Sequence, residues 1–214
     1  MPRGKRASGS PSEPTSDDPE ARARQICLRL LTIEPRTRAE LAQALRRVGV
    51  PSDAAEAVLS RFTDVGLIDD AAFARAWVES RHHSRGLSRR TLCAELRRHG
   101  VDQEEIREAV DTLDPDQEVA TARRLVEQKM ASTRGQPAEA RARRAAGLLA
   151  RKGYPPGLAF RLIRETLDRE GPGATAGLDL DTEPYSDPDD PDADDLAQNP
   201  GLGGKLEPEA DYSL

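Results

Sequence analysis

The sequence predicts an all-α protein built from three tandem three-helix repeats, with a disordered tail at each end. Three observations favour this fold class. Apolar residues recur at helical spacing through the middle of the chain, and no stretch shows the strict alternation of a half-buried strand. One pattern also occurs three times at a period of about 50 residues, which is typical of helical repeat proteins.

The repeat is visible in three segments that begin at Glu40, Thr91 and Ala145. Each segment contains a leucine, a basic pair and a glycine in the same order, and the aligned leucines are 51 and 53 residues apart. The aligned residues are Leu45, Leu96 and Leu149, then Arg46-Arg47, Arg97-Arg98 and Arg151-Lys152, then Gly49, Gly100 and Gly153. Three coincidences of this kind indicate one unit used three times.

Each of these segments predicts a helix, a turn and a second helix. In the second copy, Ile106, Ala109, Val110 and Leu113 stand at positions i, i+3, i+4 and i+7, which form one face of a helix. Capping patterns mark the helix starts at Thr37 with Glu40, at Asp102 with Glu105, and at Asp114 before Pro115. Glycines after the basic pairs, and Gly66, mark the ends.

A further helix is expected before each pair, over residues of about 21–31, 70–84 and 116–130. The predicted organisation is a tail over 1–19, repeats over 20–68, 69–114 and 115–170, and a tail over 171–214. With three Phe and one Trp in the whole chain, each local core is thin. Each repeat should therefore lean on its neighbour, giving an elongated, curved, solenoid-like body.

The two tails are predicted from composition. Residues 1–19 are rich in Ser, Pro, Gly and charge, and residues 171–214 are rich in Asp, Pro and Gly. The chain carries a net charge of −6, but residues 20–171 hold 28 Lys or Arg against 23 Asp or Glu, whereas residues 172–214 hold 1 against 12. We hypothesise that the acidic tail competes with a polyanionic partner for the basic body. A solubilising spacer is the alternative.

The composition also predicts where the protein works. The two cysteines, Cys27 and Cys93, fit reduced core residues better than a disulfide framework. No apolar run approaches the roughly 20 residues that span a bilayer, and the N-terminus lacks a secretory signal. We therefore expect a cytoplasmic protein without a membrane segment.

The motifs of common enzymes are missing from the sequence. There is no GxxxxGK[ST] loop and no GxGxxG turn after a strand, so neither common phosphate cradle is predicted. His82 and His83 are adjacent, lack partners at zinc-ligand spacing and are expected at the surface. Asp69-Asp70 is expected to start a helix, and Phe73 and Trp77 are expected in the core. We predict no catalytic residue, no metal site and no cofactor.

The residues from Gly66 to Val78, GLIDDAAFARAWV, resemble the signature of the RecX family of RecA regulators. Arg81, Arg85-Gly86 and Gly100-Val101 continue the resemblance, which covers roughly residues 21–169. The likeness implies a regulator that binds the RecA filament on single-stranded DNA. It would limit the ATPase, strand-exchange and co-protease activities of RecA, and so temper recombination, DNA repair and the SOS response.

Basic side chains are the candidate contacts to RecA or to DNA, acting from a monomer. If the repeats stack in register, the three basic pairs lie along one edge, although cations at helix C-termini also stabilise a helix without any partner. The first-rank candidates are Arg46, Arg47, Arg97, Arg98, Arg151 and Lys152, and the second rank are Arg36, Arg38, Arg85, Arg89, Arg90, Arg141, Arg143 and Arg144. A direct DNA-binding protein of helix-turn-helix type and a helical-repeat scaffold for another partner remain as alternatives.

Overall fold

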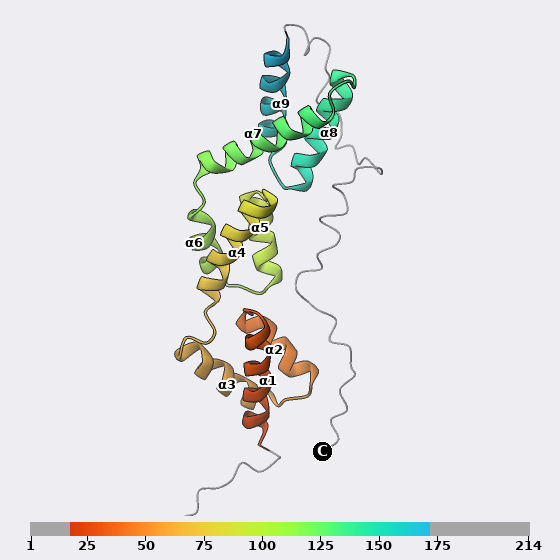
Figure 1. Cartoon of the computed structure of the whole chain (residues 1–214). Helices are drawn as coiled ribbons and strands as arrows, with labels where there is room; N and C mark the ends of the chain where they lie inside the picture. The colour runs from red at the N-terminus through yellow and green to blue at the C-terminus, as the bar shows by residue number, and fades with distance from the viewer. Residues whose placement is uncertain (1–17, 172–214) are drawn as a thin grey trace, which may run out of the picture. The chain divides into compact units, whose positions relative to one another are not determined.

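The computed structural model describes residues 18–171, and both predicted tails lie almost entirely outside this range. Within it, the chain forms nine α-helices and no strand (Figure 1). The helices are α1 (Pro19–Ile33), α2 (Arg38–Arg47), α3 (Ser52–Asp64), α4 (Asp70–Arg85), α5 (Arg89–Arg98), α6 (Gln103–Asp111), α7 (Pro115–Ser132), α8 (Ala138–Arg151) and α9 (Pro156–Glu170). The predicted all-α class with three helices per repeat is confirmed.

The helices gather into two compact bodies. The first body ends at Glu118 and holds α1 to α6 with the first turn of α7; we call it the N-terminal unit. The second body begins at Val119 and holds the rest of α7 with α8 and α9; we call it the C-terminal unit.

The predicted helix boundaries follow from local capping. Thr37 and Glu40 form a reciprocal capping box at the start of α2, and the side chain of Asp69 accepts a hydrogen bond from the Ala72 N–H (2.7 Å) at the start of α4. Asp102 caps α6 through the Glu104 N–H (2.9 Å). The predicted terminal glycines, at positions 49, 66, 100 and 153, all have positive φ.

The third helix of each repeat shows the same buried face in all three copies. Four positions in α3, in α9 and in or directly after α6 are buried in all three repeats, and they follow the sequence alignment of the repeats. The equivalent residues are Ala55, Ile106 and Ala159; Val58, Ala109 and Leu162; Leu59, Val110 and Ile163; and Phe62, Leu113 and Thr166. The repeated core, rather than the surface, therefore defines the three-helix unit.

Trp77 of α4 is buried as predicted, whereas Phe73 and one histidine depart from their predictions. Trp77 is 9% exposed and stacks on Phe73, with ring centroids 5.5 Å apart, although Phe73 itself is only half-buried. His82 was expected at the surface, but it is buried at 9% exposure, and its Nδ1 lies 2.9 Å from the Leu87 carbonyl oxygen. That contact closes the turn after α4, so the prediction for His82 is wrong. His83 is exposed, as expected.

Candidate partner-binding surfaces

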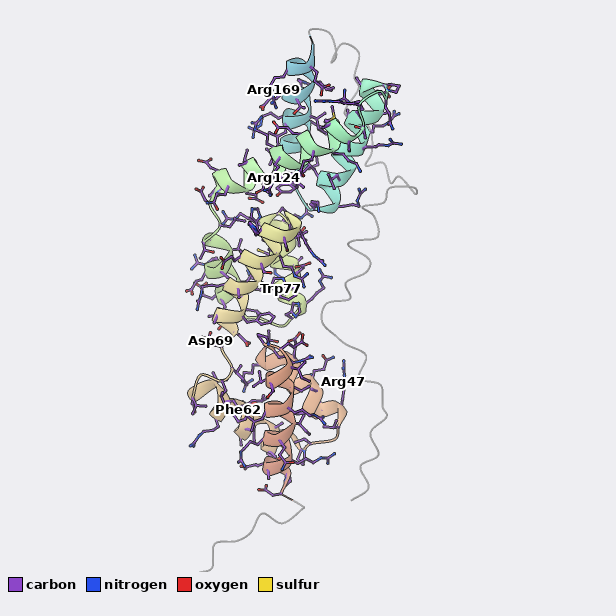
Figure 2. The ribbon with its side chains drawn as sticks, viewed as in Figure 1. Arg47, Phe62, Asp69, Trp77, Arg124 and Arg169 are labelled. Atoms are coloured by element: carbon purple, nitrogen blue, oxygen red, sulfur yellow. The ribbon has the colours of Figure 1, made fainter. Side chains whose placement is uncertain are left out.

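The basic pairs at the ends of α2 and α5 are exposed. Arg46 and Arg47 make no ion pair with any residue that the structure describes. Arg97 donates to the Gln103 side chain (3.1 Å) and Arg98 to the Ala94 carbonyl oxygen (3.4 Å), so neither is neutralised by a carboxylate. These four guanidinium groups are open to an anionic partner, and Figure 2 labels one of them, Arg47.

The third basic pair has a different environment. Arg151 and Lys152 are half-buried where α8 ends, and both already interact within the protein. Their cations are less available than those of the other two pairs. The sequence alignment could not reveal this difference, because it records residue type and not burial.

Five of the second-rank arginines are paired with carboxylates, and four of these pairs are partly exposed. Arg89 lies 2.6 Å from Asp111, and Arg143 lies 2.6 Å from Glu139. The other two partly exposed pairs are Arg36 with Glu34 and Arg38 with Glu56. Such pairs are partly exposed and contribute little to stability, but they reduce the positive potential offered to a partner.

Arg141 is placed differently from the other candidates. It is 8% exposed, and it binds both carboxylate oxygens of Glu170 (2.6 and 2.8 Å) and the Met130 carbonyl oxygen (3.0 Å). The hydrogen bond from Arg141 keeps the pKa of Glu170 below its usual value. This geometry ties α8 to the ends of α7 and α9 and withdraws Arg141 from contact with a partner.

Of the three remaining second-rank arginines, Arg85 and Arg144 are half-buried and Arg90 is exposed. Arg85 is the last residue of α4 and is half-buried, while Arg90 is exposed and makes no ion pair within the described residues. Arg144 donates to the Gln136 side chain (2.5 Å). Of the three, Arg90 offers the most accessible charge.

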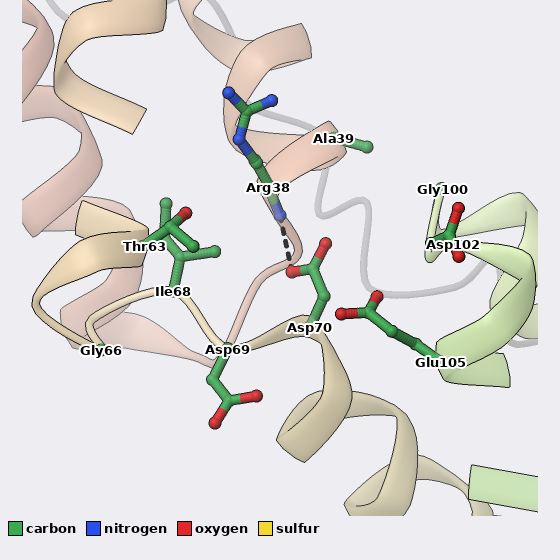
Figure 3. Close-up of a pocket in the computed structure, with 10 residues that line it drawn as sticks. All are labelled: Arg38, Ala39, Thr63, Gly66, Ile68, Asp69, Asp70, Gly100, Asp102 and Glu105. Carbon is green, nitrogen blue, oxygen red and sulfur yellow. Dashed lines mark hydrogen bonds between the residues drawn. The ribbon is translucent and has the colours of Figure 1, made fainter. Parts of the chain in front are cut away.

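A polar joint that the sequence did not predict connects the first and second repeats. The Thr37 hydroxyl donates to the His99 carbonyl oxygen (2.6 Å), and His99 Nδ1 donates to Glu40 Oε1 (2.7 Å). The Arg38 N–H donates to Asp70 Oδ1 (2.9 Å; Figure 3). The cap of α2 therefore also binds the helices of the next repeat.

The same kind of backbone contact recurs one repeat later. Arg89 occupies in α5 the position that Arg38 occupies in α2, and its N–H donates to Glu118 Oε1 (2.8 Å). Asp70 and Glu118 both stand in the first turn of the first helix of the following repeat, α4 and α7 respectively. In both cases a carboxylate from the first helix of one repeat therefore accepts a hydrogen bond from the backbone at the start of the second helix of the preceding repeat.

Close packing at the joint depends on Gly100. Its φ is +76°, and a Cβ atom added there would lie 2.4 Å from the Ala39 Cβ. Real Cβ atoms do not approach a neighbouring side chain so closely, and the left-handed conformation also favours glycine. The sequence predicted a helix end at Gly100; the contact with Ala39 is a second reason for glycine.

An acidic pocket of about 550 Å³ opens beside this joint, with Asp70 and Glu105 facing each other across it (Figure 3). Burial, with help from neighbouring carboxylates, raises the pKa of both groups. For Glu40, burial acts to raise the pKa, but the hydrogen bonds that it accepts from His99 and from the Thr37 N–H act in the opposite direction. Together with the nearby charges of His99 and Arg36 they outweigh burial, so the pKa of Glu40 is lower than its usual value.

The structure contains few features that suggest chemistry. Among residues 18–171, no group of three or more His, Cys, Asp or Glu side chains is arranged to hold a metal ion. No helix in that range is both long enough and apolar enough to cross a bilayer. Cys27 is buried, which raises the pKa of its thiol to about 11 and makes it a poor nucleophile.

Comparison with family models gives three matches in tandem. The model described as RecX, first three-helix domain, matches residues 23–62, and the second three-helix domain matches residues 69–110. The third three-helix domain matches residues 116–163. The matched ranges follow the three groups of helices in order.

Full-length relatives give the same result. The Regulatory protein RecX of Thermobifida fusca is 61% identical over 155 residues, which cover 72% of this chain and 84% of that protein. The Regulatory protein RecX of Streptomyces coelicolor is 58% identical over 154 residues, covering 72% and 82%. A crystal structure of RecX from Lactobacillus salivarius matches with a TM-score of 0.63 at 19% identity, covering 69% of this chain and 96% of that one, which supports the fold.

Proposed function

Because this chain belongs to the RecX family, we propose that it regulates RecA by binding the RecA filament on single-stranded DNA. In this proposal the protein inhibits the ATPase, strand-exchange and co-protease activities of RecA. It would thereby limit recombination, DNA repair and the SOS response. The observation that carries the proposal is the ordered match of three RecX domains, together with relatives named as regulatory proteins.

Binding, and not catalysis, is the proposed mode of action. We expect a cytoplasmic monomer that touches the filament at several weak sites, because linked weak contacts add through effective concentration. The exposed pairs Arg46-Arg47 and Arg97-Arg98 are the preferred contacts, since no carboxylate neutralises them. Arg151 and Lys152 are also proposed contacts, but they are half-buried and their charge is less accessible.

The direct test is the ATPase rate of RecA on single-stranded DNA while this protein is added. Inhibition at amounts well below one molecule per RecA protomer supports regulation of the filament. An unchanged rate across the titration contradicts the proposal, even if the protein binds bare DNA.

A matched pair of variants tests the contacts. The variant R46Q/R47Q/R97Q/R98Q removes four exposed cations and should lose most of the inhibition while its melting temperature changes little. The control R24Q/R29Q/R61Q/R75Q removes four other exposed arginines of the N-terminal unit and should inhibit like the wild type. Equal loss in both variants would mean that overall charge, and not the basic pairs, determines binding.

A further inference from the structure

The positive charge of the folded region is concentrated in the C-terminal unit. Residues 20–118 hold 16 Lys or Arg against 18 Asp or Glu, a net charge of −2, while residues 119–171 hold 12 against 5, a net charge of +7. The three repeats therefore do not share the basic character equally. A polyanion should be attracted most strongly to the C-terminal unit.

The outer face of the third helix shows this difference at equivalent positions. Where α9 carries Arg161 and Arg164, α6 carries Glu108 and Asp111, and α3 carries Ala57 and Ser60. All six residues are exposed, whereas the buried positions of the same helices match closely. The core thus preserves one fold, and the surface of α9 alone among the three helices is basic.

Ion pairs leave part of this charge unneutralised. Glu165 lies 2.7 Å from Arg123 and 4.0 Å from Arg161, and Glu127 lies 3.0 Å from Arg169. Arg124 and Arg164 are exposed and make no ion pair within the described residues. Two carboxylates therefore serve three arginines, and two further arginines of the same helices, α7 and α9, have no carboxylate partner in the part of the chain that the structure describes; Figure 2 labels Arg124 on α7 and Arg169 on α9.

One aromatic ring lies in this basic face. Phe160 is half-buried, and it does not belong to the apolar cluster that fills the C-terminal unit. It precedes Arg161 and stands one helical turn before Arg164. The equivalent residues are Arg107 in α6 and Glu56 in α3, so neither of those helices carries an aromatic ring there.

From this arrangement we infer that α9 binds single-stranded nucleic acid, with Arg161 and Arg164 contacting phosphates and Phe160 stacking on an unpaired base. Guanidinium groups bind phosphate oxygens in a bidentate manner, and base–aromatic stacking requires bases that are not already paired. A helix that follows a tight turn is also the helix that helix-turn-helix proteins present to nucleic acid. The inference rests on the proposed function for its biological setting, where the strand is that of the RecA filament.

The phosphate contacts and the stacking contact predict different responses to salt. The test measures binding of the full-length protein to a labelled single-stranded oligonucleotide without RecA, over a range of salt concentrations. R161Q/R164Q should weaken binding about tenfold at low salt and reduce the slope of log K against log salt by about 1.4, since each phosphate contact contributes about 0.7. F160L should weaken binding about fivefold and leave the slope unchanged.

Two controls accompany these variants. R61Q/R75Q removes the same number of exposed cations from the N-terminal unit and should bind like the wild type. A duplex of the same sequence should be insensitive to F160L, because its bases are already stacked. All the variants change exposed or half-buried side chains, and a thermal melt verifies that they fold.

The outcomes separate this inference from the proposed function. The inference about α9 is overturned if the wild type does not bind the oligonucleotide, or if the wild type and R161Q/R164Q bind it equally. It is also overturned if a peptide of residues 172–214 binds this face while the oligonucleotide does not. If R161Q/R164Q loses oligonucleotide binding but still inhibits RecA, the α9 contact with nucleic acid is upheld. If the wild type binds the oligonucleotide through α9 but has no effect on RecA, the α9 contact is still upheld, while the proposed regulation of RecA fails.

Discussion

The second and third repeats share a core and differ in what surrounds it. Ile106, Ala109 and Val110 of α6 are buried like Ala159, Leu162 and Ile163 of α9. Around the first set, carboxylates bind arginines and backbone N–H groups of neighbouring helices, as Asp111 does with Arg89. Around the second set, cations outnumber carboxylates. The buried face is therefore shared, whereas the exposed face differs: α6 carries Glu108 and Asp111 where α9 carries Arg161 and Arg164.

The largest expected effect is at the joint of the N-terminal unit. G100A places a Cβ atom where Ala39 already lies and forces a left-handed residue to carry a side chain. We expect it to lower the free energy of unfolding by about 3 kcal/mol, through strain and overpacking together. Chemical denaturation measures this.

The control for that prediction is G49A. Gly49 has a similar φ of +74°, but no atom lies within 4 Å of the added Cβ. The free energy of unfolding of G49A should fall by only about 1 kcal/mol, the cost of placing a side chain on a left-handed residue. If both variants lose the same free energy, the close contact between the first two repeats has no energetic importance.

A partly buried ion pair, Arg141 with Glu170, provides the next test within the C-terminal unit. R141A removes the hydrogen bonds to Glu170 and to the Met130 carbonyl oxygen. We expect a loss of about 2 kcal/mol, below the range for fully buried pairs because the Glu170 side chain is 34% exposed. R143A, which removes an exposed pair with Glu139, should cost less than about 0.5 kcal/mol. If R141A and R143A lower the free energy of unfolding equally, Arg141 contributes no more to stability than an exposed arginine does.

Asp70 separates hydrogen bonding from charge at the joint. D70A removes the acceptor of the Arg38 N–H and should cost about 1 kcal/mol. D70N keeps an acceptor oxygen and removes the repulsion that helps to raise the pKa of Glu105. It should match the wild type or exceed it in stability. A D70N variant as unstable as D70A would show that the charge itself is needed.

The pH dependence of stability should follow Glu40. Its pKa is lower in the folded protein than in the unfolded chain, so its contribution is complete above the ordinary glutamate pKa and is lost as the pH falls through the folded pKa. Replacement by E40Q should flatten the acid limb of melting temperature against pH. Asp70 and Glu105, whose pKa values are raised, act with the opposite sign in the same region, so the net change should be below about 1 kcal/mol.

The smallest expected effect concerns residues 172–214, which the structure does not describe. Their net charge of −11 should compete with anionic partners for the basic C-terminal unit. Truncation after Gly171 should tighten oligonucleotide binding about threefold at low salt and have less effect at high salt, since salt screens such charges. Equal affinity before and after truncation at low salt would favour the spacer.

The sequence alone was sufficient for the helices, the repeats and the family. Apolar spacing, the Thr37–Glu40 capping box and the terminal glycines all act within a few residues along the chain, so they can be recognised without a structure. The GLIDDAAFARAWV block led to the same family as the domain matches. The candidate contact residues could be named by type and spacing, but their role stays a prediction.

The tertiary structure alone decided which of those residues are available. Thr37 and His99 are 62 positions apart, and Arg141 and Glu170 are 29 apart, so no local pattern relates them. Burial of His82 and of Arg141 likewise depends on neighbours that the fold supplies. Helix formation is governed by near neighbours along the chain, whereas exposure and charge pairing are governed by neighbours in space.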